Sequence, residues 1–132
     1  LITPPGRWFL NSTFNEVAHS GERLGGPCAW MHPVDLEKVG LQNAREVVLG
    51  NEKGSLRVKV EARDVVPPGL VVVEGLWPNQ AFPGGWGVNS LVSPEAAAPN
   101  GGAVFHDTAI WVDRSATPEN EDAPSLLQTT GR

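Results

Sequence analysis

Apolar and polar positions alternate most regularly in the middle of the chain. From Leu56 to Glu61 every second residue is apolar, so Leu56, Val58 and Val60 share one face of an extended strand. A shorter apolar run, 47–49, precedes it, and the polar, glycine-bounded segment 50–54 separates the two. This spacing predicts a β-hairpin with one buried face and one solvated face.

Other segments predict one helix and several strands. Residues 33–39 begin with Pro33, carry acidic residues early and end before Gly40, which is typical of a short helix. Residues 66–69 predict a turn, and the run 70–73 is apolar at every position, which predicts a strand buried on both sides. Several short strands with one small helix predict a compact β-barrel, with further strands at 7–10, 28–31 and 108–112.

The composition agrees with a small, mainly β domain. The chain has 132 residues, of which 15 are glycine and 12 are proline, and helices tolerate neither well. A formal net charge of -5 without a block of Lys or Arg argues against a nucleic-acid partner or an anionic membrane surface. No uninterrupted apolar stretch has spanning length, so membrane insertion is not expected.

Charge is unevenly distributed along the chain. Residues 35–64 hold six acidic and six basic residues, as an ordinary solvated surface does. Residues 65–112 hold three acidic residues and no Lys or Arg. Because exposed loops normally carry charge, we expect part of this second stretch to be covered by another part of a larger protein.

The two ends suggest a domain taken from a longer chain. The start, Leu1-Ile2-Thr3-Pro4-Pro5, has no Met, no basic leader and no apolar core of a signal peptide, which predicts a cut inside a longer chain. Residues 114–132 are polar and poor in apolar side chains, so they predict a flexible tail after a folded domain at 1–113.

The sequence offers little catalytic or metal-binding chemistry. Its three histidines (His19, His32 and His106) are dispersed, and a single cysteine excludes a disulfide framework or a cysteine-rich metal site. We interpret Cys28 as a small core residue and His32 as a polar residue at a helix entry. No G-x-S-x-G motif is present, so the segment is not expected to catalyse a reaction by itself.

Two loops carry polar groups that suit ligand binding. Asn11-Ser12-Thr13-Phe14-Asn15 follows a predicted strand, and Pro83–Ser90 combines glycines with Trp86 and Asn89. Each also has a structural interpretation: turn formation for the first, and a glycine-rich surface loop with Trp86 packed as a lid for the second. The five tryptophans suit either a carbohydrate-binding surface or the filling of a small core.

The order of the motifs resembles the carboxy-terminal, molybdopterin-dinucleotide-binding domain of the dimethyl sulfoxide reductase class of molybdenum and tungsten oxidoreductases. The resemblance covers about residues 1–113 and rests on six segments in the family's order. They are Phe9-Leu10-Asn11-Ser12-Thr13-Phe14, Met31-His32-Pro33-Val34-Asp35-Leu36 with Val39-Gly40-Leu41, Val47-Val48-Leu49-Gly50-Asn51-Glu52-Lys53-Gly54, Val66-Pro67-Pro68-Gly69-Leu70-Val71, Val88-Asn89-Ser90-Leu91 and Val104-Phe105-His106-Asp107-Thr108.

The resemblance implies a double-psi β-barrel with one or two short helices, which binds and caps molybdopterin guanine dinucleotide. The molybdenum or tungsten would be carried with the cofactor, and no cofactor would be required for folding. The implied partners are the remaining domains of the same oxidoreductase chain. By position, the cofactor-binding residues would be Asn11, Ser12, Thr13, Asn89, Phe105 and His106.

One departure and two alternatives accompany this resemblance. The family's Asp-Gly-Asp-like turn is replaced by Asn43-Ala44-Arg45. The same barrel could instead be a free-standing small subunit of a formylmethanofuran dehydrogenase-like complex, or an adaptor that binds protein. We expect a cytoplasmic location, and the periplasm stays open as an alternative.

Overall fold

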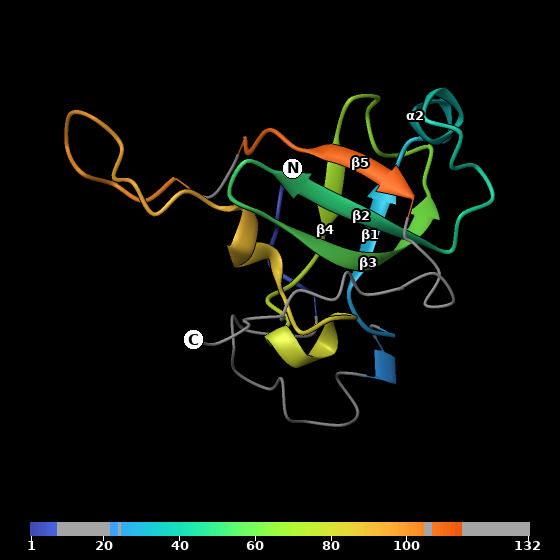
Figure 1. The fold of residues 1–132 in the computed structure, drawn as a ribbon, viewed down its shortest axis with the longest axis horizontal. Coiled ribbons are helices and arrows are strands. Elements are labelled where there is room, and N and C mark those ends of the chain that lie inside the picture. Colours follow the sequence, from blue (N-terminus) through green and yellow to red (C-terminus); the bar gives the residue numbers. More distant parts are fainter. Residues whose placement is uncertain (8–21, 24, 105–106, 115–132) are drawn as a thin grey trace, which may run out of the picture.

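The computed structural model describes residues 1–7, 22–23, 25–104 and 107–114, and it is mainly β (Figure 1). Within residues 25–104, one short α-helix and two single 3-10 turns accompany the strands. In chain order the elements are β1 (Cys28–Met31), α2 (Pro33–Lys38), β2 (Glu46–Asn51), β3 (Gly54–Ala62), β4 (Val71–Val73), η1 (Asn79–Ala81), η2 (Val88–Leu91) and β5 (Trp111–Arg114).

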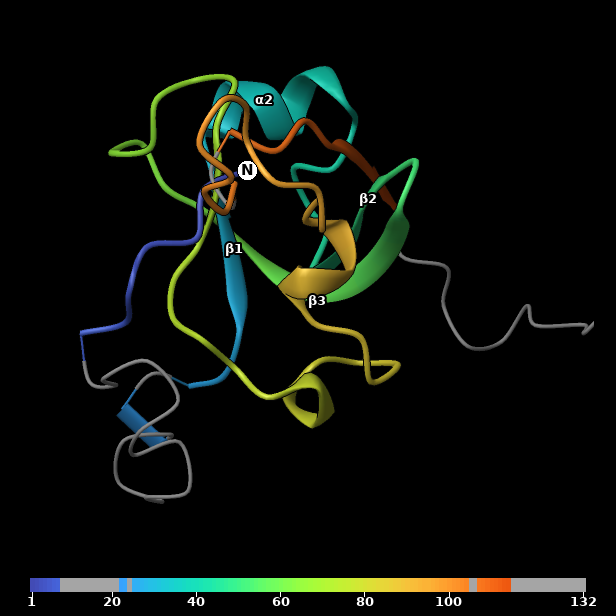
Figure 2. The same ribbon diagram turned by 90° about the vertical axis from the view of Figure 1, so that its left-hand side faces the viewer.

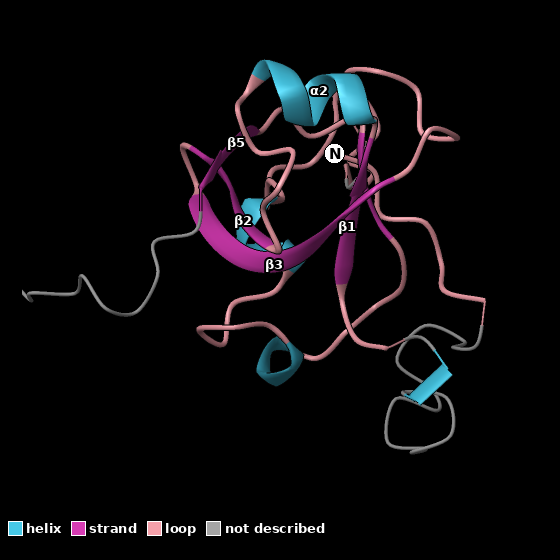
Figure 3. Ribbon diagram, turned by 90° about the vertical axis from the view of Figure 1, so that its right-hand side faces the viewer, coloured by secondary structure: helices cyan, strands magenta, loops and turns pink. Residues whose placement is uncertain are grey.

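The five strands form one mixed sheet in the order β4-β1-β3-β2-β5. β1 and β3 are parallel, with Cys28 opposite Lys59, whereas the other three neighbouring pairs are antiparallel. The sheet curls strongly (Figure 3). The core consists of buried side chains from its strands, together with residues of the loops and short helices.

Residues 1 and 2 join the two edges of this sheet. Ile2 pairs in parallel with β4: its N–H donates to Val71 at 2.9 Å and its carbonyl oxygen accepts from Val73 at 3.1 Å. On the other side, the backbone nitrogen of Leu1 donates to the carbonyl oxygen of Thr108, shortly before β5, at 2.7 Å. Backbone hydrogen bonds therefore continue around the sheet, and the strands form a barrel.

The predicted hairpin is confirmed and is tighter than expected. β2 and β3 pair from Glu46–Lys59 to Asn51–Gly54, which leaves a two-residue turn, Glu52-Lys53. Leu56, Val58 and Val60 are buried, and the residues between them lie on the outer face.

The core fills the barrel and is closed at both ends. Its centre consists of fully buried side chains from facing strands, Val47, Leu49, Val58 and Val73. Leu36 and Leu41, in and after α2, pack against one end, while Phe82, Val88 and Leu91 from the η1–η2 region complete the core elsewhere. α2 covers one end of the barrel and the two 3-10 turns lie toward the other (Figures 2 and 3).

The helix forms where the sequence predicts it. His32 is the N-cap, and its Nδ1 accepts a hydrogen bond from the Val34 N–H at 3.1 Å. Gly40 follows the helix with φ +69°, a conformation that glycine adopts at little cost.

Two strand predictions need correction. Residues 70–73 are not buried on both sides: Val71 and Val73 are buried, but Val72 is half-buried on the outer face because β4 belongs to a one-layer barrel wall. The last strand begins at Trp111 rather than at residue 108, since its register is set by pairing with β2. Most of the predicted strand 7–10, and all of the predicted tail after Arg114, lie outside the described residues.

No helix in the described part of the chain is long and apolar enough to cross a membrane.

Candidate functional site

Asn89, one of the predicted cofactor residues, lies in η2. Val88 and Leu91 of this turn are buried against the core, which places Asn89 on the outer side, exposed to solvent. A carboxamide both donates and accepts hydrogen bonds. An exposed carboxamide on a turn that is anchored by buried neighbours can therefore bind a polar ligand in a fixed orientation.

Close packing around Gly87 fixes the loop before η2. The Gly87 N–H donates to Asn79 Oδ1 at 3.2 Å, and the Ser90 hydroxyl donates to the Gly87 carbonyl oxygen at 2.8 Å. A Cβ on Gly87 would lie 2.7 Å from that Asn79 oxygen and 3.3 Å from the Phe82 ring, so a larger residue would have to displace the Asn79 side chain. Trp86 is 64% exposed, and its interpretation as a packed lid on this domain is wrong.

The Asn51 side chain connects η2 with the segment that leads into β5. Its Nδ2 donates to the Leu91 carbonyl oxygen at 2.8 Å and lies 3.5 Å from the Ala109 carbonyl oxygen. Its Oδ1 accepts from the Lys53 N–H at 2.9 Å, within the hairpin turn. One residue at the hairpin tip therefore holds together two segments that are distant in sequence, a role that sequence reasoning missed.

A hollow of about 200 Å³ lies beside this connection. Val104 and Asp107 line it and directly flank Phe105 and His106, which themselves lie outside the described residues. The structure thus brings the end of η2 and both flanks of the predicted Phe105–His106 segment to one place. The rest of the lining is Asn51, Glu52, Lys53, Leu91, Ser93, Thr108 and Ala109.

The first predicted cofactor segment contains Asn11, Ser12 and Thr13. The described residues before and after it lie at the same end of the barrel. The Arg7 N–H donates to Glu74 Oε1 at 2.9 Å, directly after β4, and Gly25 and Gly26 lead into β1. The end of the barrel opposite α2 contains the start of β1, the end of β4 and the β2–β3 turn. The strand directions require this arrangement. The predicted residues between these flanks, Asn11, Ser12 and Thr13, lie outside the described residues.

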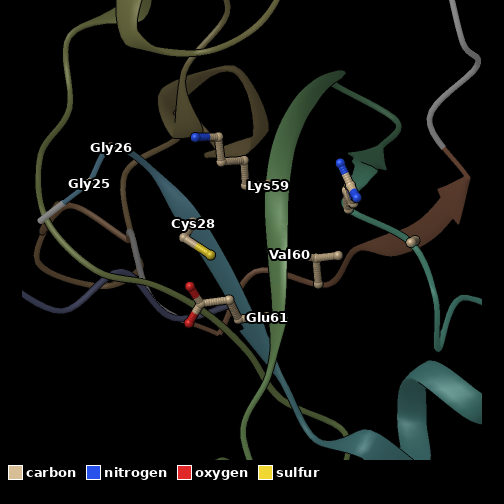
Figure 4. Close-up of a pocket in the computed structure, with 8 residues that line it drawn as sticks. Gly25, Gly26, Cys28, Lys59, Val60 and Glu61 are labelled. Atoms are coloured by element: carbon tan, nitrogen blue, oxygen red, sulfur yellow. The ribbon is translucent and has the colours of Figure 1, made fainter.

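A second hollow, of about 320 Å³, opens beside Gly25 and Gly26 (Figure 4). In Figure 4 the Cys28, Lys59 and Glu61 side chains lie on the same side of the sheet, and Val60 points to the other side. The register explains this arrangement, because Cys28 stands opposite Lys59 on the neighbouring parallel strand.

Cys28 is half-buried on the outer face of β1, so the prediction that it packs in the core is wrong. Within β1 the buried residues are Ala29 and Met31, and Cys28 alternates with them. Burial, aided by the nearby Glu61 carboxylate, raises the pKa of the thiol from its ordinary value of 9.0 to about 11. The thiol is therefore protonated at neutral pH and is a poor nucleophile.

We expect Cys28 to react slowly with thiol-alkylating reagents in the folded protein. A pKa about two units above the ordinary value leaves roughly 100-fold less thiolate at pH 7. Iodoacetamide labelling, followed by mass spectrometry from pH 7 to 11, should show a rate that rises up to about pH 11. The same chain unfolded in urea is the control, and equal rates in the two states at pH 7 would contradict the expectation.

The described polar groups at the end of the barrel opposite α2 are both charged and neutral, since Glu52, Lys53 and Asp107 also line the hollow of about 200 Å³. Asn89, Ser93 and Thr108 offer neutral donors and acceptors, as the edge of a pterin ring requires. Among the described residues, no three His, Cys, Asp or Glu side chains gather as metal ligands do.

Comparison with protein families decides the relationship. Residues 1–109 match the family model described as "Molydopterin dinucleotide binding domain". The chain belongs to this family. The sequence resemblance is thereby confirmed, and with it the cofactor class, a molybdopterin dinucleotide.

Two curated relatives of this molybdopterin-dinucleotide-binding domain are oxidoreductases by name. "Probable oxidoreductase YoaE" of Bacillus subtilis (strain 168) is 27% identical over 113 residues, 86% of this chain and 16% of its own length. A putative dimethyl sulfoxide reductase catalytic subunit of Halobacterium salinarum (strain ATCC 700922 / JCM 11081 / NRC-1) is 28% identical over 110 residues, 83% of this chain and 13% of its own length. The chain thus spans about a seventh of each relative's length.

Among solved structures, acetylene hydratase from Pelobacter acetylenicus matches 64% of this chain and 13% of its own chain. The TM-score is 0.49 and the sequence identity is 18%.

Proposed function

We propose that this domain forms one wall of the cofactor site in a larger molybdopterin oxidoreductase and caps molybdopterin guanine dinucleotide there. Family membership supplies the cofactor class. The observation that carries the proposal is the Asn51 connection, which brings the η2 turn with Asn89 beside the flanks of Phe105 and His106. The η2 turn and the described flanks of the Phe105–His106 segment, Val104 and Asp107, thus meet at one hollow, which supports the proposal.

The residues of this chain would bind and orient the cofactor. Asn89 would hydrogen-bond the amide-like edge of the pterin, and the polar segment with Asn11, Ser12 and Thr13 would approach from the flank beside Glu74. Phe105 and His106 would complete the wall. When bound, the cofactor supplies the redox chemistry together with its molybdenum or tungsten, and this domain by itself is inactive.

In the oxidoreductase that contains this domain, Asn89→Ala should lower cofactor retention by about tenfold, which corresponds to one or two lost hydrogen bonds. Because Asn89 is exposed, the substitution should leave folding intact. The measurement is pterin fluorescence and metal content per protein after gel filtration.

The matched control is Glu37→Ala, an exposed position on α2 at the opposite end of the barrel. Cofactor retention should be unchanged in that variant. If Asn89→Ala and Glu37→Ala retained cofactor equally, the assignment of this end of the barrel to the cofactor would be wrong.

A further inference from the structure

A groove of about 550 Å³ lies where the two edges of the sheet face each other. Leu1, Leu70 and Val71 line it from the β4 side, and Ile110, Trp111 and Val112 line it from the β5 side. Asp35 and Lys38 of α2, with Val39, line the groove together with Gly69, which lies in the turn before β4. The groove thus lies between the two edges in the direction in which an extended chain would continue backward from Leu1.

The strand directions determine what a continuation of this line would contact. Ile2 runs parallel to β4, and β4 is antiparallel to β1. β1 is parallel to β3, β3 is antiparallel to β2, and β2 is antiparallel to β5, so β5 runs in the same direction as β1. The strand at residues 1–2 is therefore antiparallel to β5. Residues placed before Leu1 would therefore extend from Thr108 toward Val112, with Leu70 on their other side.

Backbone groups are available for such a pairing. Donors and acceptors alternate along a strand, so Ile2 bonds to β4 while Leu1 bonds to Thr108. If the alternation continues from Thr108 into β5, Ile110 and Val112 direct their backbone groups to the same side as Thr108, toward the groove. An extended segment would find hydrogen-bond partners along this edge, as strands added to a sheet edge do.

Most side chains around the groove are apolar, and Asp35, Lys38 and Asp107 are the charged residues in its lining. Trp111 is 49% exposed and Val39 is 48% exposed. Trp111 lies in the stretch 65–112, which contains no Lys or Arg. A tryptophan left half-exposed beside an open strand edge is an energetic liability unless another segment covers it.

We propose that in the longer polypeptide the three or four residues directly before Leu1 lie in this groove as an extended strand between β4 and β5. The relatives have about seven times the length that this chain matches, so ample polypeptide exists to supply the occupant. The segment would complete the barrel wall and cover Trp111. It would also fix residues 107–109, next to the predicted Phe105–His106 segment, to the connection with the rest of the enzyme.

A disulfide cross-link in the full-length protein tests the register. Because Leu1 bonds to Thr108, the residue directly before Leu1 should stand opposite Ala109 as a non-hydrogen-bonded pair, whose Cβ atoms lie about 5 Å apart. Cysteines at these two positions, in a Cys28→Ser background, should form a disulfide in most molecules under an added oxidant. The matched control pairs the same upstream cysteine with Ala103→Cys, an exposed position outside the groove, and should not cross-link.

Hydrogen exchange provides a second measurement that does not depend on disulfide geometry. Proline at the second residue before Leu1 removes the N–H that would bond to Ile110, whereas alanine at the same position keeps it. Exchange in residues 110–112 of the full-length protein should become about tenfold faster with proline and should not change with alanine. Equal exchange rates in the two variants, together with no preferential cross-linking at Ala109, would overturn the proposal. Protection that depends on protein concentration would also overturn it, since a second copy would then fill the groove.

Discussion

Leu91→Ala should lower the free energy of unfolding by about 2–5 kcal/mol, as truncation of a buried leucine does in a well-packed core. Leu91 is 0% exposed and belongs to η2, so the lost contacts lie between this turn and the barrel interior. The cavity would also loosen the turn that carries Asn89, so cofactor retention should fall together with stability. Urea denaturation followed by tryptophan fluorescence measures the first effect.

Leu76→Ala is the matched control for this experiment. It removes the same atoms from a side chain that is 40% exposed, so the expected loss is below about 1 kcal/mol. If the two variants unfolded at the same urea concentration, the packing of η2 against the core would not contribute to the free energy of unfolding as the structure indicates.

Asn51→Asp should destabilise the domain by about 1–3 kcal/mol at pH 7, although the two side chains have nearly the same shape. The substitution replaces the Nδ2 donor by an oxygen that faces the Leu91 carbonyl oxygen at 2.8 Å, with the Ala109 carbonyl oxygen nearby. Two acceptors would then repel each other. Acidification to about pH 4 should recover part of the lost stability relative to wild type, because a protonated carboxyl group donates again.

Asn79→Asp serves as the control with the same change and the opposite hydrogen-bond role. Asn79 Oδ1 accepts from the Gly87 N–H, and a carboxylate keeps that acceptor. Thermal unfolding at pH 7 should therefore show a clear loss for Asn51→Asp and little change for Asn79→Asp. A comparable loss in both would mean that introduced charge, rather than the missing donor, causes the effect.

Local patterns were sufficient for the elements whose neighbours in space are also near in sequence. The alternation from Leu56 to Glu61 and the proline and glycine around α2 act within one hairpin or one helical turn, so the sequence alone predicts them. The mainly β fold class could be predicted from the same local patterns. The family was indicated by the order of the motifs.

Residues whose environment depends on distant pairing could not be placed in this way. Cys28 lies in an apolar run, and the side of the sheet it occupies is decided by its pairing with β3, about 30 residues later. The role of Asn51 depends on partners 40 and 58 positions away. In the candidate site, Asn89 is exposed where a ligand could reach it, while the assignments of Asn11, Ser12, Thr13, Phe105 and His106 stay predictions.

The hydrogen bond between Leu1 and Thr108 also bears on how the domain is synthesised. The two residues are separated by 107 positions, so the barrel cannot close while the ribosome is still adding its last strand. The β2–β3 hairpin can form early, whereas the pairing of Ile2 with β4 must wait for residue 73, and the final closure must wait for β5. Contacts between such distant residues slow folding, because a long loop must be ordered before they form. Until then the edges of β4 and β2 are open to wrong partners, and chaperone binding during translation should be strongest in this interval.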